Sequence, residues 1–276
     1  MILRDVPRRR DFFWAVTCRY DVRGLEVLGS SVDVLVSAGI LWRGRKFSRP
    51  NWLRRKYINR VFLDSGAQQF CTKFKDYPFT IRQYVDLVKS LKPTYAATLD
   101  YPLDITVVYH KADRRDHIHR TVENAVRLLD YDLPNLVLVI QGLEKYDFNY
   151  CLDLYQDYGL LDWKYWGIGS LCMAKNIDLM VQVCRLVRRR LGNDKWIHVF
   201  GPSVLSWSRI RPYVDSIDTS MWQRIRANRN PLPPVLSDPF KDLRKLERRK
   251  ACAKWFYKNY VKRWVGGNSQ FLGCLP

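Results

Sequence analysis

Eight short apolar runs, separated mostly by amphipathic stretches, constrain the fold of this chain more than any other feature. Runs of this length, bounded by turn residues, are typical of strands buried on both faces of a parallel sheet. They cover residues 12–18, 32–38, 61–64, 95–100, 136–141, 165–168, 196–200 and 215–218. Helical periodicity is expected over residues 80–92, 109–130, 149–158, 176–190 and 203–211. This alternation favours an α/β fold, a (β/α)8 TIM barrel. An open doubly wound sheet is the alternative, because the first two units are the least regular.

The length and composition fit one large barrel with an extension. The chain has 276 residues, 47% of them hydrophobic, which is enough for a sizeable core. We expect a catalytic barrel domain over residues 1–230, followed by a basic C-terminal helical extension, residues 231–276, packed on the barrel. A rigid linker is indicated by Pro231, Pro233 and Pro234. The helical spacing of four rings predicts that they dock the extension on the barrel: Trp255, Phe256, Tyr260 and Trp264.

The large excess of positive charge indicates a polyanionic partner. The 47 Lys and Arg residues outnumber the 27 Asp and Glu residues, which gives a net charge of +20. Residues 43–60 contain no acid, and rings are interleaved with the cations, a mixture that suits phosphates and unstacked bases. The alternative is a solvated surface whose rings pack inward. Six cations of this segment are predicted to contact a nucleic-acid backbone: Arg43, Arg45, Lys46, Arg54, Arg55 and Lys56.

The sequence gives no sign of a membrane, a disulfide framework or a metal site. No apolar run approaches the roughly 20 residues of a membrane span, so we expect a cytoplasmic protein. The seven cysteines are scattered, with Cys172 and Cys184 the closest pair, 12 positions apart. Cys71 and Cys172 are interpreted as buried apolar side chains. We expect no metal and no cofactor.

Polar residues follow the predicted strands at the points where the apolar runs stop. In a parallel barrel these ends meet at one mouth, where the chemistry of such folds takes place. Three carboxylates in one mouth raise one another's pKa values, and such sites usually perform chemistry. Asp64 alone could equally cap the following helix. The strand-end residues are Asp64, Ser65 and Gly66; Asp100; Gln141 and Gly142; Gly167, Gly169 and Ser170; His198 and Gly201; and Asp218.

The order of these motifs resembles the tRNA-guanine transglycosylase superfamily. Members share an Asp-Ser-Gly motif, an aspartate after the next strand, a Gln-Gly motif, a glycine-rich strand end, a further glycine and a final aspartate. The resemblance runs from about residue 62 to residue 224. It is closest to the DpdA-like enzymes, which insert 7-deazaguanines into DNA, in the stretches 64–67, 198–201 and 216–222.

The resemblance implies a role for each matching residue. Asp218 would be the nucleophile that attacks C1′ of the sugar and holds a covalent glycosyl intermediate. Asp64 would be the general acid and base. The base-binding residues would be Asp100, Gln141, Gly142, Gly167, Gly169 and Ser170, and the supporting residues would be Ser65, Gly66, His198, Gly201, Trp222 and Arg224. For His198, a hydrogen-bonded barrel histidine is the alternative to direct base contact.

The resemblance also implies partners. These are DNA, a free 7-deazaguanine base of the 7-cyano-7-deazaguanine type, and further proteins of a DNA-modification system. The tRNA enzymes carry a zinc site of three cysteines and a histidine, whereas Cys252 and Cys274 stand alone here, so no such zinc is expected. Three alternatives stay open: exchange on tRNA, a non-catalytic barrel that binds nucleic acid, and, more weakly, a glycoside hydrolase.

Overall fold

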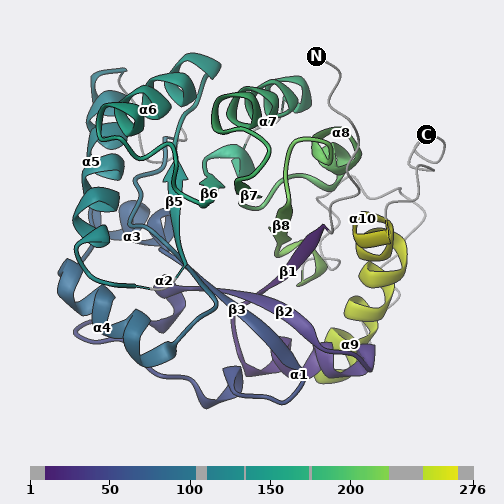
Figure 1. Cartoon of the computed structure of the whole chain (residues 1–276). Helices are drawn as coiled ribbons and strands as arrows, with labels where there is room; N and C mark the ends of the chain where they lie inside the picture. The colour runs from purple at the N-terminus through teal and green to yellow at the C-terminus, as the bar shows by residue number, and fades with distance from the viewer. Residues whose placement is uncertain (1–9, 104–110, 134, 174–175, 224–244, 267–276) are drawn as a thin grey trace.

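A computed structural model describes residues 10–103, 111–133, 135–173, 176–223 and 245–266. Eight parallel strands form a closed barrel in sequence order (Figure 1). Pairing of β1 with β8 closes the ring and rules out the open sheet. The strands are β1 (Asp11–Val16), β2 (Val32–Ser37), β3 (Ile58–Asp64), β4 (Tyr95–Ala97), β5 (Leu136–Ile140), β6 (Tyr165–Ile168), β7 (Trp196–Val199) and β8 (Ser216–Thr219).

Helices surround the barrel. Five of those described overlap the ranges expected from periodicity, whereas the three that precede residue 80 were not predicted. The helices are α1 (Arg19–Leu25), α2 (Ala38–Leu41), α3 (Ala67–Phe74), α4 (Ile81–Leu91), α5 (Lys111–Leu129), α6 (Lys145–Asp157), α7 (Ile177–Leu191), α8 (Trp207–Ile210), α9 (Lys245–Phe256) and α10 (Lys262–Gly266). Local signals set their beginnings: Thr80 and Gln83 form a capping box before α4, and Asn176 caps α7.

The alternation of side chains along each strand produces two separate cores. The inner core fills the barrel with Phe13, Leu35, Phe62, Ala97, Val137 and Val139. The outer core lies between strands and helices and is much larger. Because the period of a strand is two residues, Asp64 faces inward with Phe62, and Gln141, just beyond β5, continues the row of Val137 and Val139. The same alternation holds in β7 and β8, where His198 and Ser216 are paired in register and face inward.

Strand β4 is shorter than predicted, since it ends at Ala97 rather than at Asp100. The backbone N–H of Thr98 still donates to the carbonyl of Val137 at 3.0 Å. The Thr98 hydroxyl then accepts from the N–H of Val139 at 3.2 Å, so a side chain replaces the backbone in the ladder. Beyond this position the chain leaves the sheet, and the carboxylate of Asp100 reaches Ser65 and Gln141.

The C-terminal helices dock on the barrel as the ring spacing predicted. Helix α9 packs along α1, and a π-helical turn, Tyr257–Val261, joins it to α10 (Figure 1). Phe256 and Trp264 are buried and pack against Trp207, and the Trp264 indole N–H donates to the carbonyl of Asp11 at 2.9 Å. The predicted linker prolines, Pro231, Pro233 and Pro234, lie outside the described residues.

A buried ionic network joins α7 to the strands at the amino-terminal end of the barrel. Arg188 lies 2.5 Å from Asp215, and it also donates to the carbonyls of Gly192, Lys195 and Tyr213. Asp215 accepts in turn from the N–H of Ile197 at 2.9 Å. These contacts satisfy a charged pair away from water, which is the condition for tolerating one in a core.

The basic segment between β2 and β3 spans the length of the barrel. Residues 43–46 form a tight turn beyond the carboxyl end of β2, which we call the basic turn. Residues 54–56, which we call the distal trio, come just before β3, and the neighbouring Tyr57 carbonyl accepts from the N–H of Val32, the first residue of β2. The two groups therefore lie at opposite ends of the barrel, separated by the length of β3, about 20 Å for seven residues.

Candidate active site

The candidate active site lies at the carboxyl ends of the strands. Asp64 ends β3 and is paired in register with Ser37 of β2, whereas Asp218 lies in β8 opposite Phe13 of β1. The two carboxylates are close enough for the charge of Asp218 to raise the pKa of Asp64. The charge of Asp100 acts on Asp64 in the same direction. The three aspartates that sequence reasoning selected therefore share one mouth.

Asp218 is held through one of its two oxygens. The backbone N–H of Gly201 donates to Oδ1 at 2.8 Å, and Nε2 of His198 lies 3.2 Å from the same oxygen. Gly201 has φ +55°, a conformation that suits glycine, and a Cβ there would lie 3.0 Å from the Cβ of Cys172. No described residue donates to Oδ2 of Asp218. The arrangement fixes the carboxylate and leaves one oxygen available for attack.

The contacts of His198 define its tautomer. Nδ1 lies 2.6 Å from the hydroxyl of Ser216, and Nε2 faces Asp218. An ionised carboxylate only accepts, so both contacts are hydrogen bonds when Nε2 carries the hydrogen and the Ser216 hydroxyl donates to Nδ1. Burial lowers the pKa of His198, which keeps the ring neutral, although the neighbouring Asp218 opposes this effect. His198 is thus a hydrogen-bonded barrel histidine that orients Asp218.

Asp64 has the properties of a general acid and base. Burial, followed by the charges of Asp100 and Asp218, raises its pKa to about 7. The N–H of Gly66 donates to Oδ2 at 3.1 Å and opposes the shift, as does a hydrogen bond from Ser37. Gly66 has φ +79°, and a Cβ there would lie 2.5 Å from the backbone nitrogen of Gly39. A carboxyl group with this pKa exchanges protons readily near neutral pH.

Asp100 anchors a chain of polar side chains beside Asp64. Oδ1 accepts from the hydroxyl of Ser65 at 2.5 Å, and Oδ2 accepts from the side-chain amide of Gln141. The amide oxygen of Gln141 accepts from the hydroxyl of Ser170 at 2.5 Å, and that hydroxyl accepts from the N–H of Leu103. Burial raises the pKa of Asp100 to about 6, although the bonds from Ser65 and Gln141 lower it. This edge, rich in donors and acceptors, suits a flat heterocycle.

The three predicted base-binding glycines provide space rather than free donors. A Cβ at Gly169 would lie 2.3 Å from Nε2 of Gln141, and the Gly169 N–H already donates to the carbonyl of Ile140. A Cβ at Gly167 would lie 2.6 Å from the ring of Phe200 inside the barrel. A Cβ at Gly142 would lie equally close to the ring of Phe148 in α6. The N–H of Gly169 is therefore already paired in this structure, and base binding at this residue stays a prediction.

Some predicted residues lie elsewhere. Trp222 is fully buried in the outer core, where it packs on Trp14 and donates to the carbonyl of Ala15, so it supports the barrel and does not line the mouth. Cys172 is exposed, contrary to expectation, because it lies in a short 3-10 turn beyond β6, whereas Cys71 is buried as predicted. Arg224 lies outside the described residues. Sequence reasoning missed Ser216, which only the pairing of β7 with β8 connects to His198.

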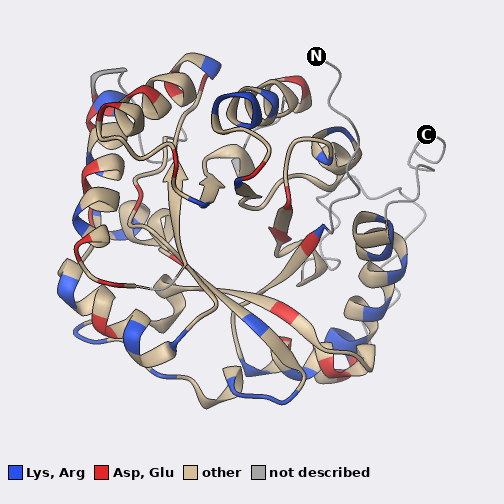
Figure 2. Ribbon diagram, viewed as in Figure 1, with Lys and Arg blue, Asp and Glu red and all other residues tan. Residues whose placement is uncertain are grey.

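The basic segment combines exposed cations with rings that face inward. Phe47 packs on Trp42 and Phe79, and the Tyr57 hydroxyl donates to the carbonyl of Val22. These rings therefore pack inward, which is the alternative that the sequence left open. The six predicted cations of this segment are all exposed, and none forms an ion pair with a described carboxylate. Figure 2 shows that Lys and Arg also occupy the outer helices.

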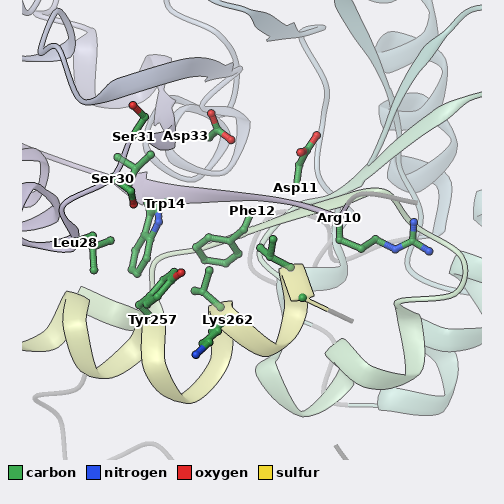
Figure 3. Close-up of a pocket in the computed structure, with 14 residues that line it drawn as sticks. Arg10, Asp11, Phe12, Trp14, Leu28, Ser30, Ser31, Asp33, Tyr257 and Lys262 are labelled. Atoms are coloured by element: carbon green, nitrogen blue, oxygen red, sulfur yellow. The ribbon is translucent and has the colours of Figure 1, made fainter. Parts of the chain in front are cut away.

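A cavity lies at the end of the barrel opposite the mouth, between the amino ends of β1 and β2 and the C-terminal helices (Figure 3). Its volume is about 310 Å³, and Phe12, Trp14 and Tyr257 are among its lining residues. Two further lining residues, Asp11 and Asp33, both form ion pairs with Arg60. None of the predicted site residues lines it.

The fold is a (β/α)8 barrel with an acidic mouth. The mouth contains Asp218, which hydrogen bonds hold in place, and Asp64, whose pKa is about 7. No protein-family model matches the chain, and no curated protein matches it. In the described ranges, no three His, Cys, Asp or Glu side chains are grouped so that they could hold a metal ion. None of the helices described is long and apolar enough to span a bilayer.

Proposed function

We propose that this chain is a DNA guanine transglycosylase, which exchanges guanine in DNA for a 7-deazaguanine base through a covalent aspartyl-glycosyl intermediate. One observation carries the proposal. Asp218 is fixed through Oδ1 while Asp64, in the same mouth, has a pKa of about 7. A nucleophile and a separate proton carrier are the two groups that base exchange through a covalent intermediate needs.

In the first half-reaction, Oδ2 of Asp218 attacks C1′ as the bond from C1′ to N9 of guanine breaks. Asp64 supplies the proton that the departing base takes up, so guanine leaves neutral and Asp64 becomes a carboxylate. In the second half-reaction, Asp64 removes the N9 proton of the incoming 7-deazaguanine base. N9 then bonds to C1′, and Asp218 departs as a carboxylate. Each carboxyl group ends in its starting state.

The polar groups of Asp100 and Gln141 match the hydrogen-bonding groups of a purine-like ligand. A carboxylate offers acceptors for the N1–H and the exocyclic amino group of guanine, and an amide offers both a donor and an acceptor. These groups are shared by guanine and 7-deazaguanines, which allows one pocket to serve both half-reactions. The target atom lies inside the base stack of a duplex, so the base must be flipped out or presented in single-stranded DNA.

The test is mass spectrometry of nucleosides from DNA incubated with enzyme and 7-cyano-7-deazaguanine. We expect incorporation with the wild type, none with Asp218→Ala, and full incorporation with Asp178→Ala, a matched exposed aspartate on α7. A denaturing gel should reveal a covalent DNA adduct, and peptide mapping should locate it on Asp218. Absence of incorporation by the wild type, or undiminished incorporation by Asp218→Ala, would refute the proposal. Competition between labelled tRNA and duplex DNA decides between the two polynucleotides.

A further inference from the structure

We infer that the basic turn, residues 43–46, grips nucleic-acid phosphates at the mouth, and that the distal trio, residues 54–56, does not. The inference rests on the proposed function for its partner and assigns the place where that partner is held. Sequence alone groups all six cations in one segment. The barrel divides them, because the segment runs from the carboxyl end of β2 to the amino end of β3.

The backbone of the basic turn is fixed. The N–H of Arg43 donates to the carbonyl of Lys46 at 2.9 Å, and Trp42 pairs with Phe47 in an isolated antiparallel bridge. Gly44 has φ +83°, and the tight turn uses this left-handed conformation. The side-chain amide of Gln83, in the first turn of α4, donates to the carbonyl of Arg45 at 3.3 Å. The fixed backbone adds little ordering cost on binding, so the remaining cost is that of ordering the long side chains.

Ring contacts connect this turn to the active site. The ring of Phe47 lies 4.8 Å from that of Phe79, which lies 5.2 Å from the ring of Tyr77. The hydroxyl of Tyr77 donates to the carbonyl of Asp100 at 2.7 Å. Two ring contacts and one hydrogen bond therefore separate the basic turn from the edge that would read the base. The turn is close enough to hold the strand whose base enters the mouth.

The charge of the basic turn is opposite in sign to that of the mouth and of a phosphate backbone. The mouth contains three aspartates, and the negative charge of those that are ionised repels a phosphate backbone. Arg43, Arg45 and Lys46 are exposed, and no described carboxylate pairs with them, so their charge is available to phosphates. The distal trio is equally exposed but lies about 20 Å away along β3, on the face opposite the mouth. It serves as a matched control of the same net charge.

The test measures the affinity for a fluorescein-labelled single-stranded oligonucleotide by anisotropy at several KCl concentrations. Each phosphate contact contributes about 0.7 to the slope of log Kd against log salt for single strands. Replacing Arg43, Arg45 and Lys46 by Ala should lower the slope by about 2 and weaken binding at least tenfold at 0.1 M salt. Replacing Arg54, Arg55 and Lys56 by Ala should change the Kd less than twofold. Circular dichroism melting checks that both triple variants fold.

Arg43 also donates to the carbonyls of Ile40 and Trp42, so its loss could loosen the turn. The double variant Arg45→Gln with Lys46→Gln retains those bonds and should still lower the slope by about 1.4. Equal losses in both triple variants, or a loss only in the distal one, would overturn the inference. Binding is measured without chemistry, so the two proposals fail separately. Salt-dependent binding through the turn without base exchange would refute only the proposed function.

Discussion

His198 donates from Nε2 to Oδ1 of Asp218 at 3.2 Å, and this contact leaves the second carboxylate oxygen free of described partners. A hydrogen bond to a charged group contributes roughly 1.5–3 kcal/mol, which corresponds to about 10- to 100-fold in rate if it is lost in the transition state. We therefore expect His198→Phe to slow formation of the covalent adduct by about this factor in single-turnover experiments. The KM for DNA should stay within twofold.

Two matched variants separate positioning from packing at His198. A glutamine can donate to Asp218, so His198→Gln should recover part of the rate that His198→Phe loses. Ser216→Ala removes only the partner of Nδ1 and should have the smallest effect. Equal rates for the Phe and Gln variants, with unchanged melting temperatures, would contradict a positioning role.

Asp64 and Asp218 should fail in different ways. Asp218→Ala lacks the proposed nucleophile and should form no adduct at all. Asp64→Asn retains the nucleophile, so some adduct should form, while incorporation of 7-deazaguanine should fall by roughly 10²- to 10⁴-fold, the usual contribution of a general acid or base. In the wild type the adduct rate should decline above pH 7, as Asp64 loses its proton. Equal loss of adduct in both variants would reverse this assignment.

Ionisation of Asp64 should also lower the free energy of unfolding at alkaline pH. Its pKa is raised from 3.8 to about 7 in the folded chain, so the folded state binds this proton more tightly than the unfolded state. The stability this proton provides is complete below about pH 4 and is lost as the pH rises to 7. Asp64→Asn should therefore raise the free energy of unfolding by roughly 2–4 kcal/mol at pH 8, and less at pH 5. Urea unfolding at both pH values measures the difference, and an equal gain at both would contradict the raised pKa.

Arg188 and Arg189, adjacent on α7, should differ sharply in their effect on stability. Arg188 is buried and forms the shorter of the two ion pairs of Asp215, so Arg188→Ala leaves that buried carboxylate with the longer pair to Arg10, at 3.6 Å, and should cost roughly 3–5 kcal/mol. Arg189 is exposed, and Arg189→Ala should change the free energy of unfolding by at most about 0.5 kcal/mol. Urea denaturation compares the two variants. A small loss for Arg188→Ala would mean that water or other groups satisfy Asp215.

Much of the fold could be predicted because strand and helix patterns are local. The eight strands follow from apolar runs and turn residues, and their closure follows from the number of units. The end of β4 could not be predicted, since it depends on the Thr98 hydroxyl taking over a ladder position from the backbone. The position of Trp222 was equally hidden, because its ring contact with Trp14 joins β1 to the turn after β8, two segments far apart in the sequence.

The site could be predicted as a set of residues but not as a network. The strand-end rule selected Asp64, Asp100 and Asp218 from the sequence. The partner of each carboxylate depends on register across neighbouring strands, which periodicity does not contain. The role of Ser216 illustrates this limit, since a serine at the start of an apolar run carries no signal by itself. The division of the basic segment likewise required knowledge of both ends of the barrel.

The close approach of Gly169 to Gln141 has a consequence for how such a pocket could change its ligand. A methyl group at position 169 would occupy the place of the Gln141 amide, which would then lose its contacts with Asp100 and Ser170. A shorter side chain at position 141 would open that space again. Positions 141 and 169 are therefore coupled, and selection for a base of different size should recover paired substitutions at these two positions more often than single ones.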